Sequence, residues 1–286
     1  MFKWLLAGIA VLSQGIAADP GIAPFQLGEF EVTAIQDAAS TMRRDLFPGV
    51  SEEEFLKLAG GTQAPASVNV YLLRRGGELI LIDTGYGGER GSLLNKLEAL
   101  KISPDQIDAV LLTHMHGDHI GGLLTEQGNA VFPKATIHVS EPEHDYWQSG
   151  AAGARGELAR KVLKVYMGRI KPFRFDDEVF PGIRALDASG HTPGHTVFET
   201  PSLLIVGDLL HAAAIQFPHP NFSATYDLDP VKACRSRKKF FEQAASSSKP
   251  IAGMHLPAPG IGRIVSDGDG YRFEPQKPAE SPAVSR

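Results

Sequence analysis

The sequence predicts a layered α/β domain, and two features carry this prediction. Short apolar runs rich in β-branched residues, which are typical of buried strands, alternate along the 286 residues with segments that have helix signals. Several of these runs end in His or Asp, which would gather polar side chains at one edge of a sheet. A chain of this length is expected to form one or two domains with a sizeable core.

In the first half of the chain, strand patterns and helix signals follow one another at short intervals. A strand pattern covers residues 25–37, and Ser51 with Glu54 three positions later has the arrangement of a capping box at a helix start. A hairpin is expected to turn at Gly76-Gly77 between strands at 68–73 and 79–82. Helices are expected at residues 91–100, 141–148 and 157–170.

The second half of the chain repeats this organisation. Asp229 followed by Pro230 is typical of a helix start. The helix should place Cys234 and Phe240-Phe241 in the core and the basic run 235–239 on its solvent face. Strands are expected near residues 183–188, 197–200 and 203–206.

The most informative segment is the hexapeptide His114-Met115-His116-Gly117-Asp118-His119, which follows the apolar strand pattern 107–113. Alternate residues of an extended segment face the same side, so His114 and His116 can bind one ion while Asp118 and His119 face a second. A single histidine in such a turn would be an ordinary polar residue. Three imidazoles and a carboxylate crowded together favour a metal site.

Three further segments add candidate ligands. The segment Gly190-His191-Thr192-Pro193-Gly194-His195 places histidines around a Pro-Gly turn, where His191 is expected to brace the turn. Asp208 follows the apolar run 203–206, and His255 follows the short run 250–253. Each of these alone is more typical of a cap or a surface residue. Together with the hexapeptide they favour a site for more than one metal ion.

The motifs T-H-x-H-x-D-H-x-G-G and G-H-T-P-G-H, the Asp that ends the next strand and the late His together resemble the metallo-β-lactamase superfamily. The resemblance runs from about Phe25 to Phe273 and implies a single-domain, four-layer αββα sandwich with two divalent metal ions. Zn²⁺ is the expected metal, and manganese, cobalt or iron also suit such ligands. Asp83, in Asp83-Thr84-Gly85, would hold a ligand side chain in position without binding a metal itself. The resemblance assigns His114, His116 and His195 to the first metal, Asp118, His119 and His255 to the second, and Asp208 to both.

A closer resemblance connects residues 207–217, 255–262 and 270–273 with the methyl parathion hydrolase branch, which also contains lactonases and arylesterases. Two features depart from that branch. Only twelve residues separate His195 from Asp208, and the loop after Asp83 offers Glu89-Arg90 rather than a large aromatic residue. The missing aromatic residue predicts that flat aryl phosphotriesters are held less well than lactones or esters.

The resemblance implies a metal-dependent hydrolase in which a hydroxide held between two metals attacks a lactone or an aryl or carboxylic ester. Phosphotriesters would be secondary substrates. The catalytic side chains are expected to be Asp118, which would pass the proton, Asp208, and His211, which is the most interesting residue outside the ligand set. The substrate pocket is expected to be formed by Trp147, Phe217 and Phe222.

Two alternatives stay open. One is an organophosphate phosphotriesterase of the methyl parathion hydrolase type. The other, of a different class, is an oxidoreductase that resembles the persulfide dioxygenases and holds a single iron, since His and carboxylate ligands also suit iron. A true β-lactamase is disfavoured because such enzymes do not normally use a bridging Asp such as Asp208. No G-x-S-x-G segment indicates a serine nucleophile.

The N-terminus has the pattern of a secretory signal, with Lys3, an apolar stretch at residues 4–12 and small residues at Ala17-Ala18. We therefore expect residues 1–18 to be removed and residues 19–273 to form a catalytic domain that is periplasmic or secreted. Residues 274–286 contain three prolines and are expected to form a flexible tail.

The composition narrows the range of partners. The net charge of −5, from 28 basic and 33 acidic residues, provides no basic field for nucleic acid. No stretch after the signal has the length of a membrane span, and the single Cys234 excludes an intramolecular disulfide. The expected partner is a small ester, lactone or phosphotriester, and a homodimer is compatible with the sequence.

Overall fold

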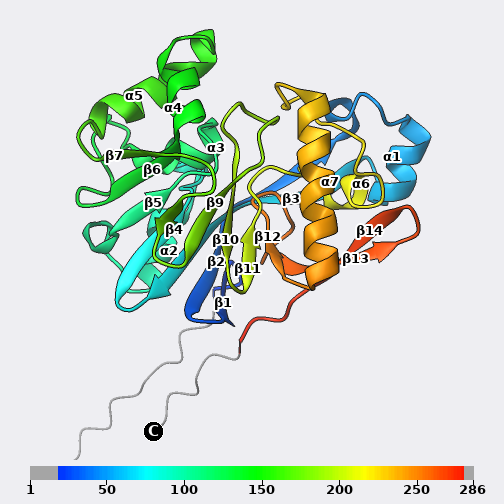
Figure 1. Ribbon diagram of the computed structural model, residues 1–286, viewed down its shortest axis with the longest axis horizontal. Coiled ribbons are helices and arrows are strands. Elements are labelled where there is room, and N and C mark those ends of the chain that lie inside the picture. Colours follow the sequence, from blue (N-terminus) through cyan, green and yellow to red (C-terminus); the bar gives the residue numbers. More distant parts are fainter. Residues whose placement is uncertain (1–18, 280–286) are drawn as a thin grey trace, which may run out of the picture.

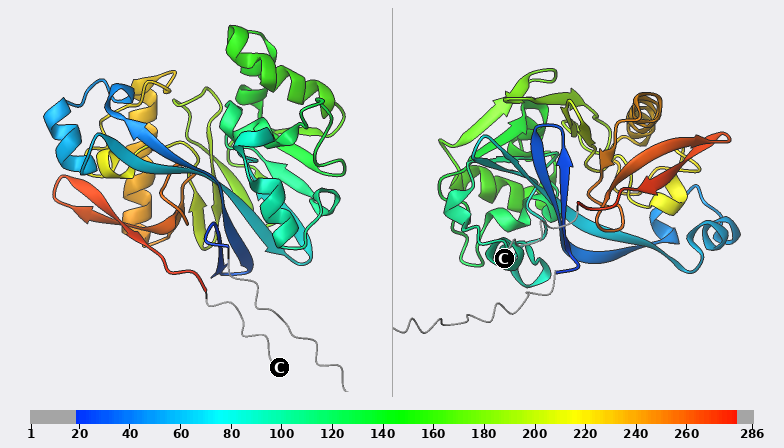
Figure 2. Two further views of the ribbon diagram at one scale, coloured as in Figure 1. Left: turned by 180° about the vertical axis from the view of Figure 1, so that it is seen from behind. Right: turned by 90° about the horizontal axis from the view of Figure 1, so that it is seen from below.

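The computed structural model describes residues 19–279, and two mixed β-sheets form its centre (Figures 1 and 2). The expected signal segment, residues 1–18, lies outside the described residues, as do residues 280–286. The first sheet has the strand order β1 (Ile22–Leu27), β2 (Phe30–Arg43), β3 (Gln63–Arg75), β4 (Glu78–Ile82), β5 (Ala109–Leu111), β6 (Thr136–Ser140) and β7 (Ile170–Phe173). The second has the order β14 (Gly270–Pro275), β13 (Ile261–Asp267), β12 (Ile251–Ala252), β11 (Leu203–Ile205), β10 (Thr196–Thr200), β9 (Ile183–Asp187) and β8 (Glu178–Phe180).

Helices cover the outer faces of the two sheets. The helices are α1 (Glu52–Ala59), α2 (Leu93–Ala99), α3 (Gly117–Ile120), α4 (Glu141–Gln148), α5 (Glu157–Val165), α6 (Ala213–Gln216) and α7 (Pro230–Ser247). Figure 1 shows α4 and α5 on one side of the molecule and α7 on the other, with the strands between them. Within residues 19–279, no helix combines the length and apolar character that a bilayer span requires.

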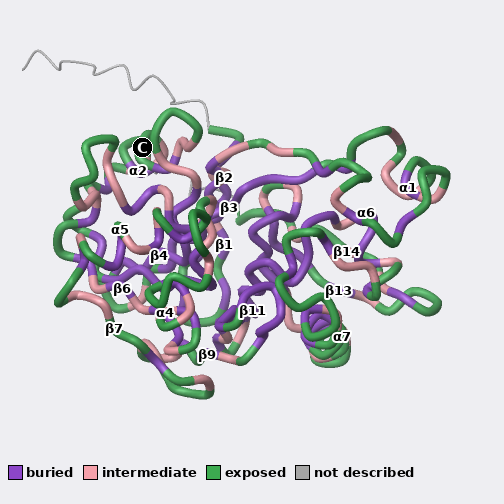
Figure 3. The backbone as a smooth tube through the Cα atoms, turned by 90° about the horizontal axis from the view of Figure 1, so that it is seen from above, coloured by how far each residue is buried: buried purple, intermediate pink, exposed green. Residues whose placement is uncertain are grey.

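Three apolar clusters show which faces of the sheets are buried. Tyr71 and Phe198 belong to the cluster that packs between the two sheets. Leu97 of α2 and Val162 of α5 belong to the cluster on the outer face of the first sheet, and Phe240 of α7 packs on the second sheet. Figure 3 shows the same division, with buried residues concentrated in the strands. The predicted four-layer αββα sandwich is therefore confirmed.

The strand directions bring the candidate ligands to one edge of the sandwich. β4, β5 and β6 are parallel neighbours in the first sheet, and β11 and β12 are parallel in the second. Asp83 follows β4, the histidine hexapeptide follows β5, Asp208 follows β11 and His255 follows β12. Because the carboxyl ends of parallel strands meet at the same edge, side chains from distant parts of the sequence converge there.

Most of the predicted elements agree with the structure. α4 has the predicted bounds, and the β3–β4 hairpin turns at Gly76-Gly77, where both residues have positive φ. The side chains of Ser51 and Asp229 accept backbone hydrogen bonds from Glu54 and Lys232, so they cap α1 and α7 as predicted.

Three boundaries differ from the predictions. The pattern at 25–37 belongs to two paired strands, β1 and β2. The helix expected to reach Ile170 ends at Val165, because Ile170 pairs with Ile137 at the start of β7. Residues 274–279 do not form the expected flexible tail, because β14 continues to Pro275 and the backbone N–H groups of Gln276 and Ala279 donate to Ile261 and Pro24. A proline fits at position 275 because β14 is an edge strand, where a missing N–H is tolerated.

The basic run on α7 also differs from its prediction. Arg237 is 0% exposed, although the run 235–239 was expected to face solvent. Arg237 is four residues after Ala233 and three before Phe240, which is the spacing of the packed face of a helix. Cys234 is half-buried rather than in the core, with its Sγ 3.6 Å from the carbonyl oxygen of Pro220.

Candidate metal centre

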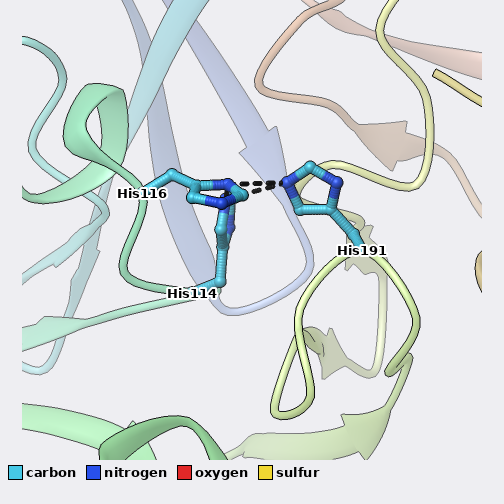
Figure 4. Close-up of side chains that lie close together, drawn as sticks. All are labelled: His114, His116 and His191. Carbon is cyan, nitrogen blue, oxygen red and sulfur yellow. Dashed lines mark hydrogen bonds between the residues drawn. The ribbon is translucent and has the colours of Figure 1, made fainter. Parts of the chain in front are cut away.

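Three histidine nitrogens meet at the edge where the strands end. His114 Nε2 lies 2.9 Å from His116 Nδ1 and 3.2 Å from His191 Nε2, and His116 Nδ1 lies 2.9 Å from His191 Nε2. Figure 4 shows His191 extending toward the other two rings from its own loop, which lies between β9 and β10. This spacing is close to the edge of about 3.3 Å expected for a tetrahedral metal site with bonds of about 2.0 Å. We call these residues the first cluster.

Burial keeps the first cluster uncharged. Burial and the neighbouring His119 hold the pKa of His114 well below its ordinary value. Burial and the neighbouring His191 lower the pKa of His116 to about 3, and burial lowers that of His191 to about 4. Neutral imidazole is the form that binds metal, so the three nitrogens are ready to act as ligands near neutral pH.

A second cluster consists of Asp118, His119 and His255. Asp118 Oδ1 lies 3.8 Å from His119 Nε2, and Asp118 Oδ2 lies 3.5 Å from His255 Nε2. Asp208 lies between the two clusters, with Oδ1 3.3 Å from His119 Nε2 and Oδ2 3.4 Å from His191 Nε2. One carboxylate therefore reaches both groups of ligands.

The Asp208 carboxylate and the histidines around it influence each other's pKa values. Burial would raise the pKa of Asp208, but His119 and His255 hold it well below its ordinary value. Burial would lower the pKa of His255, but the Asp208 carboxylate raises it to about 9. A buried carboxylate that stays ionised needs positive charge beside it.

Unpaired polar atoms test whether metals fit this arrangement. His119 Nε2 and Asp208 Oδ1 are buried and have no hydrogen-bond partner among the described residues, and both ring nitrogens of His211 share this property. Burying such atoms unpaired is unfavourable. Imidazole and carboxylate are ligands for divalent zinc and related metals, which would satisfy His119 and Asp208. The donor atoms of the two clusters therefore fit a dinuclear divalent metal site.

Comparison with known proteins identifies the family. Residues 64–255, more than half of the chain, match the metallo-beta-lactamase superfamily. The chain belongs to this superfamily. Its solved relatives extend the match over almost the whole chain, and it is a metallo-β-lactamase superfamily hydrolase.

Three relatives show how far the similarity reaches. The hydrolase AbOPH of the β-lactamase superfamily is 32% identical, with a TM-score of 0.83 over 92% of this chain and 100% of that chain. AidC, a dizinc quorum-quenching lactonase in complex with a product, is 29% identical, with a TM-score of 0.84 over 91% of this chain and 99% of that chain. The N-acyl homoserine lactonase of Bacillus thuringiensis is 28% identical over 170 residues. That match covers 57% of this chain and 61% of the lactonase, which is less than two thirds of its length.

The structure assigns His195 a role other than the predicted one. Its Nδ1 lies 3.1 Å from the carbonyl oxygen of Ala188, and its Nε2 accepts the backbone N–H of Asp208 at 2.8 Å. Both ring nitrogens therefore contact the backbone, and His191 occupies the position that the resemblance gave to His195. Gly207 permits this approach, because a Cβ there would lie 2.5 Å from His195 Nε2. His195 thus positions Asp208.

The ligand histidines are oriented by partners at their other ring nitrogen. His119 Nδ1 lies 2.7 Å from Asp83 Oδ2, so Asp83 has the supporting position that the resemblance implied. His191 Nδ1 lies 3.0 Å from Asp227 Oδ1. Such contacts fix the tautomer and direction of a metal-binding imidazole.

Asp227 was not predicted as part of the site. Its Oδ2 lies 3.3 Å from Arg237 Nη2, and both side chains are fully buried. The chain Arg237–Asp227–His191 therefore connects α7 with the first cluster. Arg237, a basic residue at a core position of α7, is a sequence signal for a buried ion pair. Its partner Asp227 could not be found from the sequence, because it lies in a loop with no recognisable motif.

Glu143 of α4 joins the two loops that carry the first cluster. Its Oε1 accepts hydrogen bonds from the Met115 backbone at 2.9 Å and from Trp147 Nε1 at 2.6 Å. Its Oε2 accepts from Thr192 Oγ1 at 2.7 Å and from the Gly194 backbone at 2.9 Å. Because each carboxylate oxygen accepts two hydrogen bonds, Glu143 holds the hexapeptide loop against the loop of His191.

His211 lies beside the two clusters. Its Nε2 is 3.3 Å from Asp208 Oδ2, its ring stacks on His255 at 5.2 Å between centroids, and it is 1% exposed. His211 can therefore orient Asp208 or contact a substrate at the metals. Its catalytic role, like that of Asp118, stays a prediction.

The predicted pocket residues do not gather around the metals. Trp147 packs its indole 5.5 Å from the His116 ring but is only 2% exposed, so it lies behind the ligand. Phe217 is 2% exposed and stacks on Phe273 in the core beneath α7. Phe222 contacts His219 instead. Trp147 and Phe217 are therefore packed in the interior, where a substrate cannot reach them, and Phe222 is half-buried beside His219.

Proposed function

We propose that this protein hydrolyses lactones and aryl or carboxylic esters at a dinuclear metal site. The observation that carries the proposal is Asp208, whose two oxygens reach the first and second clusters from a buried position. Similarity to the lactonase AidC supports lactones as the favoured substrates. The similar N-acyl homoserine lactonase of Bacillus thuringiensis points to the same class.

The side chains divide into those that hold the metals and those that contact the reactants. The metals, when bound, would polarise a carbonyl oxygen and make a water molecule acidic enough to supply the nucleophile. Asp118 is the most accessible carboxylate of the site, with its side chain 24% exposed, and it can accept a proton and pass it to the leaving oxygen. His211 can donate a hydrogen bond to the substrate from its position beside Asp208. The holding residues are His114, His116 and His191 for one metal, Asp118, His119 and His255 for the other, and Asp208 for both.

A substrate panel tests this proposal. The purified protein, with its metal content measured, is assayed against N-acyl homoserine lactones, 4-nitrophenyl esters, methyl parathion, a β-lactam and a glutathione persulfide. We expect kcat/KM for the best lactone or ester to exceed that for methyl parathion by about tenfold or more, which is roughly 1.4 kcal/mol of transition-state stabilisation. The matched control is Asp208→Asn at the same protein concentration.

Each alternative has its own signature in this panel. A higher kcat/KM for methyl parathion than for every lactone and ester would make phosphotriester hydrolysis the main function. Oxygen consumption with the persulfide, at one iron per chain, would indicate the dioxygenase instead.

Export is a separate part of the proposal. It is supported by the signal pattern at residues 1–18 alone. N-terminal sequencing of the protein recovered from the periplasm or medium is expected to begin near Asp19. An intact N-terminus on protein confined to the cytoplasm would contradict export and leave the hydrolase proposal unaffected.

A further inference from the structure

The exposure of the ligands indicates from which side a substrate reaches the metals. The Asp118 side chain is 24% exposed, and His116 is also partly exposed. The side chains of His114, His119 and Asp208 are at most 3% exposed. A substrate must therefore approach on the side of Asp118.

Tyr226 is an exposed aromatic residue beside this approach. Its ring centroid lies 5.2 Å from that of His211, at an angle of 43° between the rings, and the residue is 43% exposed. His211 itself is buried and contacts Asp208. Burial and the nearby Asp118 carboxylate raise the pKa of Tyr226, so its hydroxyl stays neutral. The ring of Tyr226 thus links the buried site with the molecular surface.

The segment that carries Tyr226 is fixed to the first cluster. The next residue is Asp227, whose carboxylate contacts His191 and Arg237. The backbone N–H of Leu228 donates to the carbonyl oxygen of His191 at 3.1 Å, and that of Asp229 donates to Gly190 at 2.9 Å. A side chain on such an anchored segment is held in position when a substrate binds, which is what a specificity contact requires.

A second tyrosine lies near Asp118 on another loop. Tyr86 follows β4, and its backbone N–H donates to Asp37 Oδ2 at 2.8 Å. The guanidinium carbon of Arg90 lies 3.8 Å from the centre of its ring. Burial and the Asp118 carboxylate raise the pKa of Tyr86. The loop after Asp83 therefore carries an aromatic side chain, Tyr86, with Arg90 stacked on its ring, so the expectation that this loop offers only Glu89-Arg90 is wrong.

Two further apolar side chains that follow Tyr226 closely in the sequence are also exposed. Leu228 is 44% exposed, and Val231 in the first turn of α7 is 70% exposed. With Tyr226 they are three of the large apolar or aromatic side chains exposed in the part of the chain that the structure describes. A substrate with an apolar chain would gain contact area here without entering the buried site.

We propose that Tyr226 determines the acyl-chain preference of this hydrolase. Its ring contacts the apolar acyl group of the substrate while the lactone or ester lies at the metals, and Leu228 extends the contact toward the surface. This inference rests on the proposed function and names its substrate class: lactones and esters with a medium or long acyl chain.

The test compares substrates that differ only in chain length. The metal-loaded wild type, Tyr226→Ala, Tyr226→Phe and the control Met167→Ala are assayed with N-butanoyl to N-decanoyl homoserine lactones and with 4-nitrophenyl acetate to octanoate. Met167 is a suitable control because it is 75% exposed and lies beyond the end of α5. The quantity compared is the ratio of kcat/KM between the longest and the shortest chain.

We expect Tyr226→Ala to lower this ratio about tenfold, roughly the change when two methylene groups lose an apolar contact. Tyr226→Phe should retain the ratio because the ring is kept, and Met167→Ala should match the wild type. An unchanged ratio in Tyr226→Ala would overturn the assignment, as would a wild type that does not distinguish chain lengths.

A binding measurement separates this inference from the proposed function. Calorimetry with N-hexanoyl- and N-decanoyl-homoserine needs no turnover, and the metal-loaded wild type should bind the longer chain more tightly, with the difference lost in Tyr226→Ala. If lactones are not hydrolysed, the proposed substrate preference fails, but the ester series and the binding ratio still decide the role of Tyr226. Equal binding ratios in both proteins would contradict it.

Discussion

The two histidines of Gly190-His191-Thr192-Pro193-Gly194-His195 should respond in opposite ways to replacement by alanine. His191→Ala removes one of the three nitrogens that lie 2.9–3.2 Å apart in the first cluster. Substitution of a residue that only orients a metal ligand typically weakens metal binding about 10- to 100-fold. Loss of the ligand itself should therefore weaken metal binding by about 100-fold or more, roughly 2.7 kcal/mol. The fold should be less affected than in His195→Ala, because Asp227, which loses the His191 ring as a partner, still accepts from Arg237 and from the Ala224 backbone.

His195→Ala should instead reduce stability while leaving both metals bound. It leaves the Asp208 backbone N–H without its buried acceptor and opens a cavity, at a cost of about 2–4 kcal/mol. For a chain of this size, such a loss lowers Tm by about 5–15 °C. The assay measures metal content after dialysis against a zinc buffer, together with thermal unfolding. Two metals in His191→Ala and one in His195→Ala would refute the assignment of His191 as the ligand.

Three further changes test other parts of the site. Asp208→Asn should lower kcat by about 100-fold or more, because it replaces the carboxylate that joins the clusters with a neutral amide, while the far-UV circular dichroism stays that of the wild type. Unchanged kcat at full metal content would show that Asp208 is not a bridging ligand. Arg237→Met leaves Asp227 as a buried carboxylate without its cation, and we expect the free energy of unfolding in urea to fall by about 3–5 kcal/mol. Arg235→Met on the same helix is the control, and equal effects of the two substitutions would contradict the role of Arg237. Burial lowers the pKa of His191 and His195 to about 4, so the stability that their neutral forms provide is present above pH 6.5 and is lost as the pH falls toward 4. The raised pKa of His255 offsets part of this loss, because its protonated form stabilises the fold at low pH. Chelator-treated protein should therefore melt a few degrees lower at pH 5 than at pH 7, and a pH-independent Tm would refute this.

The sequence predicted the fold well because its signals are local. The Ser51 and Asp229 caps, the Gly76-Gly77 turn and the bounds of α4 each depend on a few neighbouring residues. The end of α5 could not be predicted, because Ile170 pairs with Ile137 of a strand far earlier in the sequence. The end of β14 could not be predicted either, because Pro275 has its place through pairing with Gly262 of β13.

The site shows the same division between local and distant information. The hexapeptide, Asp208 and His255 were found because each follows an apolar strand. Motif spacing alone could not decide between His191 and His195, since the choice depends on which ring reaches His114 and which reaches the Asp208 backbone. Asp227 and Tyr226 gave no signal, because their partners are 10 to 36 residues away and meet them only in the folded chain.

The central claim is that this fold holds two divalent metals joined by Asp208. Anomalous diffraction from crystals of the zinc-loaded protein tests it most directly. Two peaks are expected: one in contact with His114, His116 and His191, and one in contact with Asp118, His119 and His255, with the Asp208 carboxylate touching both. A single peak, or a peak coordinated by His195 in place of His191, would contradict this account.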